Sequence, residues 1–423
     1  MRRAFAAGAA LLLAACATRR PLPPPGALLD LAITALGDGR IDEAQEQVAM
    51  ARRYAPEDVA VAHWSSILAE MLWNDDEAIR EQSAAIRNAR AAGLEAVEIQ
   101  ALRGRLGDLL FQVGRWGECS GPLLAGALGA DAERRRAFAT VAYGLPFARK
   151  PSGPLLTEQR LLPGDTPEFL CGAGDRVRPF AIDTGTSMTT VSRSFADELG
   201  IPTPLPAGEA LDAAGRRLAI EVGTLPRFTV GDIELGAVPV LVVDDAVLRL
   251  RDLFGGPERV PRGVLGLDLL ASFRFTVDPE RGSVQLELPR GLPPSESVQC
   301  LRSEGRCLVP VFVEGARLWF VLDTGASHSS LTSRGVDALP GGAGRAVPSF
   351  RRVRTVGGSV VAVRELRDLV LRCSDVRFQG VTLPVVARGG ESLFPVHGVL
   401  GIDLMGRCRV TLDRGRARIE AVP

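Results

Sequence analysis

Two aspartates occupy the same place in two similar segments of this 423-residue chain. Phe180–Ser187 reads FAIDTGTS and Phe320–Ser327 reads FVLDTGAS, so an apolar, strand-like run leads into Asp-Thr-Gly each time. The aspartates are Asp183 and Asp323. Carboxyl groups act as general acids and bases when their surroundings adjust their pKa. If the fold brings these two together, they could activate a water molecule and donate a proton.

Further blocks are duplicated around these motifs. GVLGLDLL begins at Gly263, 80 residues after Asp183, and GVLGIDLM begins at Gly398, 75 residues after Asp323. FRFTVD then follows the first block, and CRVTLD follows the second. Short apolar runs alternate with turn residues throughout, which is typical of β-strands. The duplication predicts two related, mainly β lobes.

The pattern of apolar-Asp-Thr-Gly followed by apolar-apolar-Gly resembles the retropepsin-like aspartic proteases, the clan that also contains pepsin. Two such units in one chain resemble a fused, pseudo-twofold version of the retroviral homodimer. The resemblance covers residues 165–423 and implies two barrel lobes that form one aspartic endopeptidase site. It implies a protein or peptide substrate, no cofactor and no metal. Two carboxyl groups about 3 Å apart share one proton, so one activates water while the other acts as the acid.

The resemblance also assigns roles to neighbouring residues. Thr184 and Thr324 would lock the two active-site loops together, and Gly185 and Gly325 would allow tight turns. Thr186 offers a hydroxyl that would stabilise a charged Asp183. The loops that support the aspartates consist of Thr184, Gly185, Thr186, Ser187, Thr324, Gly325, Ala326 and Ser327. The apolar floor behind these loops consists of Val264, Leu265, Gly266, Val399, Leu400 and Gly401.

Other positions are expected to shape the cleft. Glycine-rich stretches at Gly215 and at Gly357 and Gly358 fit flaps of the retroviral kind, or two ordinary hairpin turns. Met188 and His328 stand where family members line substrate pockets, although a surface or core role suits His328 equally well. Asp268 and Asp403 are expected to cap short helices. The arginine that retroviral members often carry after the apolar-apolar-Gly is replaced by Leu267 and Ile402, so the loop must be held otherwise.

The N-terminus has the features of a targeting segment. Arg2 and Arg3 precede a short apolar run that ends in LAAC at Cys16, which resembles a bacterial lipoprotein signal with Cys16 as the lipidated residue. An ordinary secretory signal with a chance cysteine is the alternative. Ala17 follows instead of the retention residue Asp, so the resemblance implies an outer-membrane lipoprotein that faces the periplasm of a Gram-negative bacterium. The lipid would be its only membrane anchor.

The segment after the signal reads as helical repeats. Small residues at Gly39, Ala44 and Ala51, with Pro56 after them, resemble a tetratricopeptide repeat, and degenerate copies begin near Trp73 and Gly114. An irregular helical bundle is the alternative. Such repeats bind protein partners or position a neighbouring domain. The predicted division of the chain is signal 1–15, tether 16–26, helical repeats 27–145, linker 146–164, lobe 1 at 165–289, linker 290–299 and lobe 2 at 300–423.

Composition limits the other possibilities. The chain has 50 Lys+Arg and 50 Asp+Glu, so it lacks the basic field expected of a nucleic-acid-binding protein. Six cysteines besides Cys16 allow disulfides in an oxidising compartment, but buried free thiols are equally compatible. The linker between the lobes is long enough for them to pair within one chain, as a monomer. Two non-catalytic alternatives remain, a peptide-binding module and an envelope scaffold that acts through the repeats.

Overall fold

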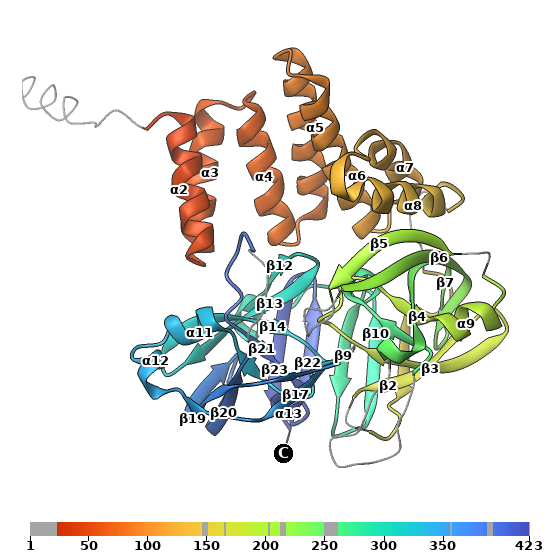
Figure 1. The fold of residues 1–423 in the computed structure, drawn as a ribbon, viewed down its shortest axis with the longest axis vertical. Helices are drawn as coiled ribbons and strands as arrows, with labels where there is room; N and C mark the ends of the chain where they lie inside the picture. Colours follow the sequence, from red (N-terminus) through yellow and green to blue (C-terminus); the bar gives the residue numbers. More distant parts are fainter. Residues whose placement is uncertain are drawn as a thin grey trace, which may run out of the picture.

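The computed structural model describes residues 23–145, 151–164, 166–201, 204–211, 217–248, 261–355, 358–386 and 392–422. These residues form a helical domain followed by two mainly β lobes (Figure 1). Within the described part of the chain, no helix is both long and apolar enough to cross a membrane.

The helical domain consists of three helical hairpins and a last helix. Small side chains such as Ala32, Ala35, Ala44 and Ala51 are completely buried and allow close helix packing. The helices extend from Pro25 to Tyr143, and their assignment to tetratricopeptide-like repeats stays a prediction. The helices are α2 (Pro25–Gly37), α3 (Ile41–Tyr54), α4 (Val59–Met71), α5 (Asp75–Ala91), α6 (Ala96–Gln112), α7 (Trp116–Ala125), η1 (Gly129–Asp131) and α8 (Ala132–Tyr143).

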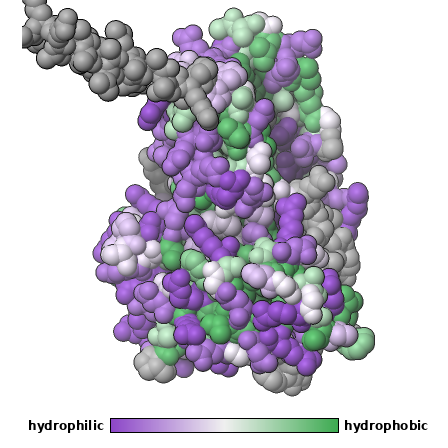
Figure 2. Space-filling model, turned by 90° about the vertical axis from the view of Figure 1, so that its left-hand side faces the viewer, coloured by the Kyte–Doolittle hydropathy of each residue, from purple (hydrophilic) through white to green (hydrophobic). Residues whose placement is uncertain are grey.

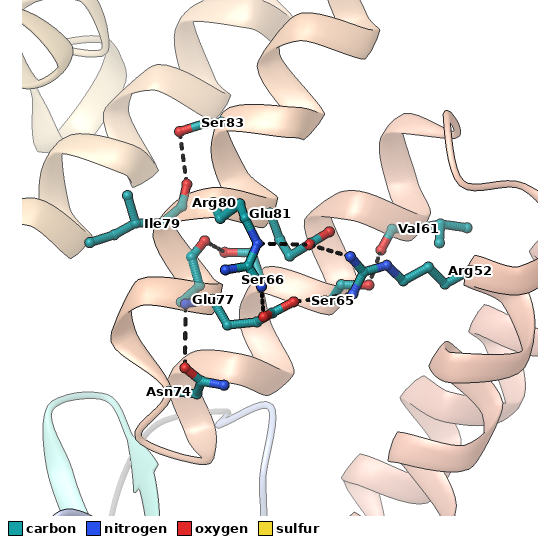
Figure 3. A network of polar contacts seen from close by, with 11 residues as sticks. Arg52, Val61, Ser65, Ser66, Asn74, Glu77, Ile79, Arg80, Glu81 and Ser83 are labelled. Carbon is teal, nitrogen blue, oxygen red and sulfur yellow. Dashed lines mark hydrogen bonds and ion pairs between the residues drawn. The ribbon is translucent and has the colours of Figure 1, made fainter.

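A polar network joins the first two hairpins (Figure 3). Arg52 of α3 donates hydrogen bonds to Glu77 at 3.1 Å and to Glu81 at 2.5 Å, both on α5. Arg80 forms a second ion pair with Glu77. The Ser66 hydroxyl of α4 donates to the Ala78 carbonyl at 2.8 Å. Because Glu81 is buried, its carboxylate requires the ion pair with Arg52, and this ion pair helps to fix the angle at which the two hairpins pack.

Each lobe is built around one sheet. The lobe 1 sheet has the order β2-β3-β8-β4-β7-β6-β5, and the lobe 2 sheet has the order β12-β13-β14-β21-β15-β20-β19-β16. The lobe 1 elements are β2 (Glu168–Ala173), β3 (Arg176–Ile182), β4 (Thr190–Ser192), α9 (Arg193–Glu198), β5 (Leu205–Leu211), β6 (Arg217–Val230), β7 (Ile233–Val243), η2 (Asp245–Leu248), β8 (Gly263–Leu265) and α10 (Leu267–Leu270).

Lobe 2 repeats this plan and adds a separate two-stranded sheet, β17-β18. Its elements are β12 (Leu301–Ser303), β13 (Arg306–Val313), β14 (Ala316–Leu322), β15 (Ser330–Leu331), α11 (Ser333–Asp337), α12 (Gly342–Arg345), β16 (Val347–Pro348), β17 (Arg352–Thr355), β18 (Gly358–Val361), β19 (Arg364–Cys373), β20 (Val376–Val385), β21 (Gly398–Leu400) and α13 (Ile402–Met405).

A third sheet joins the lobes, with the order β1-β10-β9-β22-β23-β11. At its centre β9 pairs antiparallel with β22, and the hydroxyls of Thr276 and Thr411 lie 3.0 Å apart. The sheet consists of β1 (Leu156–Arg160), β9 (Arg274–Asp278), β10 (Ser283–Glu287), β11 (Val298–Gln299), β22 (Cys408–Asp413) and β23 (Arg416–Ala421), with η3 (Pro294–Glu296) before β11.

Two predicted linkers therefore need correction. β1 lies inside the predicted linker 146–164, and η3 and β11 lie inside the predicted linker 290–299. β1 pairs antiparallel with β10 and β11 pairs antiparallel with β23, so both strands contribute to the joining sheet. The sequence LTEQR of β1 is mostly polar, so its strand character comes from pairing with β10 and not from an apolar pattern.

The turns of the helical hairpins pack on the lobes. Gly39, between α2 and α3, has φ +76° and lies against Trp319, whose indole Nε1–H donates to the Gly39 carbonyl at 3.0 Å. Trp73, between α4 and α5, stacks with the Arg302 guanidinium at 4.1 Å. Apolar residues of α2, α3 and α4 share one core with residues of β12, β13 and β14. The helical domain is thus attached to the lobes along its turns.

The surface of the molecule is uneven in polarity. Figure 2 shows hydrophilic and apolar residues side by side, both on the helical part and on the β-rich part below it. Among the exposed apolar residues of lobe 2 are Phe350 and Val363, which are 91% and 70% exposed. The helical domain also exposes apolar side chains, such as Val97 and Leu124, so apolar surface is present on both parts of the molecule.

The six described cysteines are buried free thiols, so none of the pairings that the sequence allowed is formed in this structure. Burial raises the pKa of Cys119 and of Cys373 to about 12 and that of Cys408 to about 11. At neutral pH these thiols stay protonated and pack as small apolar groups.

Candidate active site

The strands bring the two aspartates together between the lobes. Asp183 directly follows β3 and Asp323 directly follows β14. The parallel partners β8 and β21 supply the carbonyls of Leu265 and Leu400, to which the aspartate amides donate at 3.1 Å in both lobes. The side chains of Asp183 and Asp323 contact each other through a hydrogen bond. The structure therefore joins the two motifs into one pair of carboxyl groups.

Glycines make this close approach possible. The amide of Gly185 donates to Asp183 Oδ1 at 2.8 Å, and that of Gly325 donates to Asp323 Oδ1 at 2.9 Å. Each glycine also packs against the aspartate of the other lobe, where a Cβ atom would collide with the carboxyl group. Glycine is required here for lack of space and not for an unusual backbone angle.

The two threonines lock the loops, as the family resemblance implied. Thr184 Oγ1 donates to the Leu322 carbonyl at 2.6 Å and accepts from the Thr324 amide at 3.1 Å. In the reciprocal arrangement, Thr324 Oγ1 donates to the Ile182 carbonyl at 2.8 Å and accepts from the Thr184 amide at 3.1 Å. Both side chains are buried. Four hydrogen bonds thus connect the lobes directly below the carboxyl groups.

Burial and the nearby charge of Asp323 raise the pKa of Asp183 well above its usual range, and the amides of Gly185 and Thr186 lower it by less. Asp183 and Asp323 are 6% and 9% exposed, so water screens their repulsion poorly. The pair therefore holds one proton to a higher pH than a solvent-exposed aspartate would. Because the two carboxyl groups titrate as one unit, the stabilisation of a charged Asp183 by the Thr186 hydroxyl stays a prediction.

Two further aspartates hold the active-site loops from behind. Asp268 Oδ1 accepts from the amide and the hydroxyl of Thr189, at 2.8 and 2.9 Å. Asp403 Oδ1 accepts from the amide and the hydroxyl of Ser329, both at 2.7 Å. The N-cap residues of α10 and α13 are glycines, so neither aspartate is the N-cap, although Asp403 Oδ1 also accepts from the Leu404 amide in the first turn of α13 at 3.0 Å.

These hydrogen bonds hold the active-site loops in place of the arginine that this sequence lacks after each apolar-apolar-Gly motif. The hydroxyls of Thr189 and Ser329 accept from the amides of Gly266 and Gly401, at 3.1 and 2.9 Å. A chain of hydrogen bonds thus connects each loop to the segment behind it. Sequence reasoning missed Thr189 and Ser329, although both follow their DTG motif at the same distance and differ from each other by one methyl group.

The residues of the predicted floor lie in corresponding places in the two lobes. Val264–Leu265 and Val399–Leu400 are buried in β8 and β21, which run beside β3 and β14. Gly266 and Gly401 lie against the backbone of Met188 and His328, where a side chain would collide. This contact places the predicted pocket residues Met188 and His328 at the ends of the active-site loops.

The remaining predicted residues lie at the rim of the site. Ser187 is exposed, while Ala326 is buried. The Ser327 hydroxyl lies 2.9 Å from Nδ1 of His328, and both residues line a cavity of about 1180 Å³ that reaches Thr324. Neither aspartate lines this cavity, whose wall also includes Val277 and Val410 of the joining sheet.

The predicted flaps coincide with two hairpins, β5–β6 in lobe 1 and β17–β18 in lobe 2, which we call the cover hairpins. Gly358 begins β18. Gly215 and Gly357 lie outside the described residues, as does Cys16. In the described ranges, no group of three or more His, Cys, Asp or Glu side chains is arranged to hold a metal ion.

Comparison with known proteins agrees with this geometry. The sequence model of the family described as aspartyl protease matches residues 171–269 and 309–404, one segment in each lobe. The match and the arrangement of the two aspartates support an aspartic protease. No curated protein matches the chain.

Two solved structures are similar to parts of the chain. A retropepsin-like aspartic protease from Rickettsia conorii is 22% identical over 32% of this chain and 94% of its own, with a TM-score of 0.24. The aspartic proteinase from Irpex lacteus is 12% identical over 63% of this chain and 97% of its own, with a TM-score of 0.39.

Proposed function

We propose that the protein is an endopeptidase-type hydrolase that cleaves peptide bonds with a water molecule held between Asp183 and Asp323. The observation that carries the proposal is the contact between two buried carboxyl groups, one from each lobe, inside a shared hydrogen-bond network. A peptide-binding protein without catalysis would not require both acids. The symmetric amide donors from Gly185 and Gly325 fit a pair that exchanges one proton during each turnover.

The proton transfers of the reaction follow from the single proton that the two carboxyl groups share. The two carboxyl groups share one proton, and with this proton on Asp183, Asp183 begins as the acid and Asp323 begins as the base. Asp323 takes a proton from the water, whose oxygen bonds to the peptide carbon, while Asp183 gives its proton to the carbonyl oxygen. Asp323 then protonates the leaving nitrogen as the C–N bond breaks, and Asp183 recovers a proton from the tetrahedral carbon's hydroxyl.

The test is digestion of a mixed peptide library from pH 3 to pH 8 by soluble protein without the first 25 residues. The same digestion is repeated with Asp183→Asn and with Asp323→Asn. Peptide cleavage by the wild type and loss of cleavage in both variants supports the proposal. Peptide binding without cleavage by the wild type overturns it and favours a binding module.

We also propose that the protein is attached to the outer membrane by lipid on Cys16 and faces the periplasm. The apolar run before LAAC and the proline-rich tether after it support this location. In cells fed a labelled fatty acid, the full chain should carry label and fractionate with membranes. A Cys16→Ala variant should lose both properties, and an unlabelled wild-type protein would refute the proposal.

A further inference from the structure

A cavity of about 1180 Å³ lies behind the active-site loop of lobe 2, and the proposed reaction does not use it. Thr324 and His328 of that loop line it, together with Val277 and Val410 of the joining sheet. Neither aspartate and no described residue of a cover hairpin borders it. α13, which forms part of its wall, lies on the side of the lobes away from the helical domain (Figure 1). The cavity is therefore separate from the pair of carboxyl groups.

The duplication provides an internal comparison for this cavity. Its lining residues Ser327, Ile402, Asp403 and Gly406 correspond to Ser187, Leu267, Asp268 and Ala271 of lobe 1. The lobe 1 residues border a space of only about 10 Å³, which is closed by Gln112 of α6 and by Arg302 and Gly305. Lobe 1 thus fills this place with protein, whereas lobe 2 leaves it open to a ligand.

The inner wall of the cavity is apolar and buried. Val277, Met405 and Val410 are 9%, 3% and 2% exposed, and the half-buried Leu161 and Leu162 also line the cavity. A mostly apolar wall is typical of a pocket for a small ligand, and the volume is slightly above the usual range of about 300–1,000 Å³. An apolar chain that entered would leave water and gain free energy by burying its surface.

A peptide fits this wall poorly, because the wall offers few backbone donors. Pro163, Pro167 and Pro279 line it and have no N–H group. The amides of Leu161 and Leu162 are already used, since they donate to backbone carbonyls at 2.8 and 2.7 Å. An extended peptide in the cavity would leave its own carbonyls without partners, which is costly. An alkyl chain has no such groups.

Exposed cations line the same cavity. They are Arg160, Arg281 and Arg407. Arg281 pairs with a carboxylate of the joining sheet, whereas Arg160 and Arg407 form no ion pair with any described residue. The two carboxylates of the wall have partners, because Glu280 lies 3.9 Å from an arginine and Asp403 holds the active-site loop. An anion at the exposed edge of the cavity would therefore meet two guanidinium groups whose charge is not already neutralised.

We infer that this cavity binds one long-chain carboxylate, with the alkyl chain on the buried apolar wall and the head group at the exposed arginines. Burial of the chain gives most of the affinity, and the arginines distinguish an anionic head from a neutral one. Every two methylenes that leave water strengthen binding about tenfold. The site does not depend on the proposed function, although its occupant would contact the active-site loop at Thr324 and His328.

The test measures binding of cis-parinarate, a fatty acid that fluoresces more strongly in apolar surroundings, to the soluble protein used for the peptide digestion. Oleate, oleyl alcohol and a short apolar peptide with a free carboxyl end are compared as competitors. We expect one parinarate per chain, displacement by oleate, and displacement by oleyl alcohol that is about tenfold weaker. Saturated carboxylates should compete more strongly as their chains lengthen, until the chain fills the cavity.

The other outcomes contradict the inference. Absence of saturable binding overturns it, and so does equal competition by oleyl alcohol, because the arginines would then have no role. Stronger competition by the peptide than by oleate would show a peptide site instead. Binding to phosphatidylglycerol vesicles without binding of monomeric oleate would show a membrane-binding surface and would also overturn it. None of these measurements requires peptide cleavage, so a failure of the proposed function leaves the test intact.

A double variant tests the site of the head group. Arg160→Gln combined with Arg407→Gln is expected to weaken oleate binding about tenfold and to leave oleyl alcohol unchanged. Arg87→Gln combined with Arg90→Gln is the matched control, because it removes the same charge from exposed arginines of α5 that do not line the cavity. If the first double variant keeps the wild-type affinity for oleate, or if both lose it equally, the inference is overturned.

A second pair of variants tests the site of the alkyl chain. Leu162→Trp places a larger side chain in the cavity and should weaken parinarate binding at least about tenfold. Leu155→Trp is the control, since Leu155 is 43% exposed and does not line the cavity. Unchanged binding by a folded Leu162→Trp protein would overturn the inference. If that variant does not fold, the arginine variants and the competitor series decide.

Discussion

The two lobes are nearly identical at the carboxyl groups and differ away from them. In both, the aspartate accepts from a glycine amide, the threonine spans to the other lobe, and a second aspartate holds the loop through a hydroxyl residue. Ser187 borders a space of only about 10 Å³, while Ser327 borders a cavity of about 1180 Å³. The shared chemistry constrains the centre of the site, and the surroundings of the two loops differ.

The largest effect is expected from the aspartates themselves. Asp183→Asn and Asp323→Asn should each lower kcat/KM about 10⁴-fold, and the double variant should be little worse, because the pair acts as a unit. Steady-state kinetics on one peptide measures this. Asp175→Asn is the control, since that side chain is 86% exposed and distant from the dyad loops, and it should behave as wild type. Retained activity in one single variant would show that the lobes are chemically unequal.

The next effect concerns the threonines below the carboxyl groups. Thr184→Val and Thr324→Val each leave a buried carbonyl and a buried amide without their partner, which costs roughly 2–4 kcal/mol of unfolding free energy. Urea unfolding should give similar losses for both variants, and Thr184→Ser should restore most of the stability. A loss in one lobe only would contradict the symmetric description of the centre.

The pH dependence of stability is a smaller effect. Because the folded-state pKa of Asp183 is raised, the native protein binds more protons than the unfolded chain, so its stability falls as pH rises above about 4. Asp183→Asn removes this ionisation and should be more stable than wild type near pH 7, with a smaller difference near pH 3. Thermal unfolding across this range tests it. A wild-type stability that rises relative to the variant toward neutral pH would refute the raised pKa.

The smallest effect is expected at the one position next to the carboxyl groups where the two lobes carry different residues. Thr186 in lobe 1 corresponds to Ala326 in lobe 2, and it is the backbone amide of Thr186 that lowers the pKa of Asp183. Thr186→Ala keeps that amide and should leave the pH–rate profile unchanged. A shift of the acidic limb would mean that the hydroxyl stabilises the charged form of Asp183, as the sequence first suggested.

Sequence reasoning was most effective where residue type alone determines the chemistry. The two DTG motifs, the glycine blocks behind them and their duplication predicted which residues meet at the centre. It failed where the partner is distant or the local pattern is weak. The contact of Asp268 with Thr189 spans 79 residues, and the strand β1 has no apolar alternation to reveal it. The placement of Gln112 and Gly305 beside Ser187 depends on the packing of a whole domain, which no short motif encodes.

One measurement tests directly that a single chain forms one dyad from both lobes. Asp183→Asn and Asp323→Asn are purified separately, mixed in equal amounts, unfolded and refolded together, and assayed against the peptide that wild type cleaves. Pairing within each chain predicts that the mixture stays as inactive as either variant, while a wild-type sample treated in the same way recovers its activity. Activity in the mixture would require an intact dyad formed between two chains and would contradict the account.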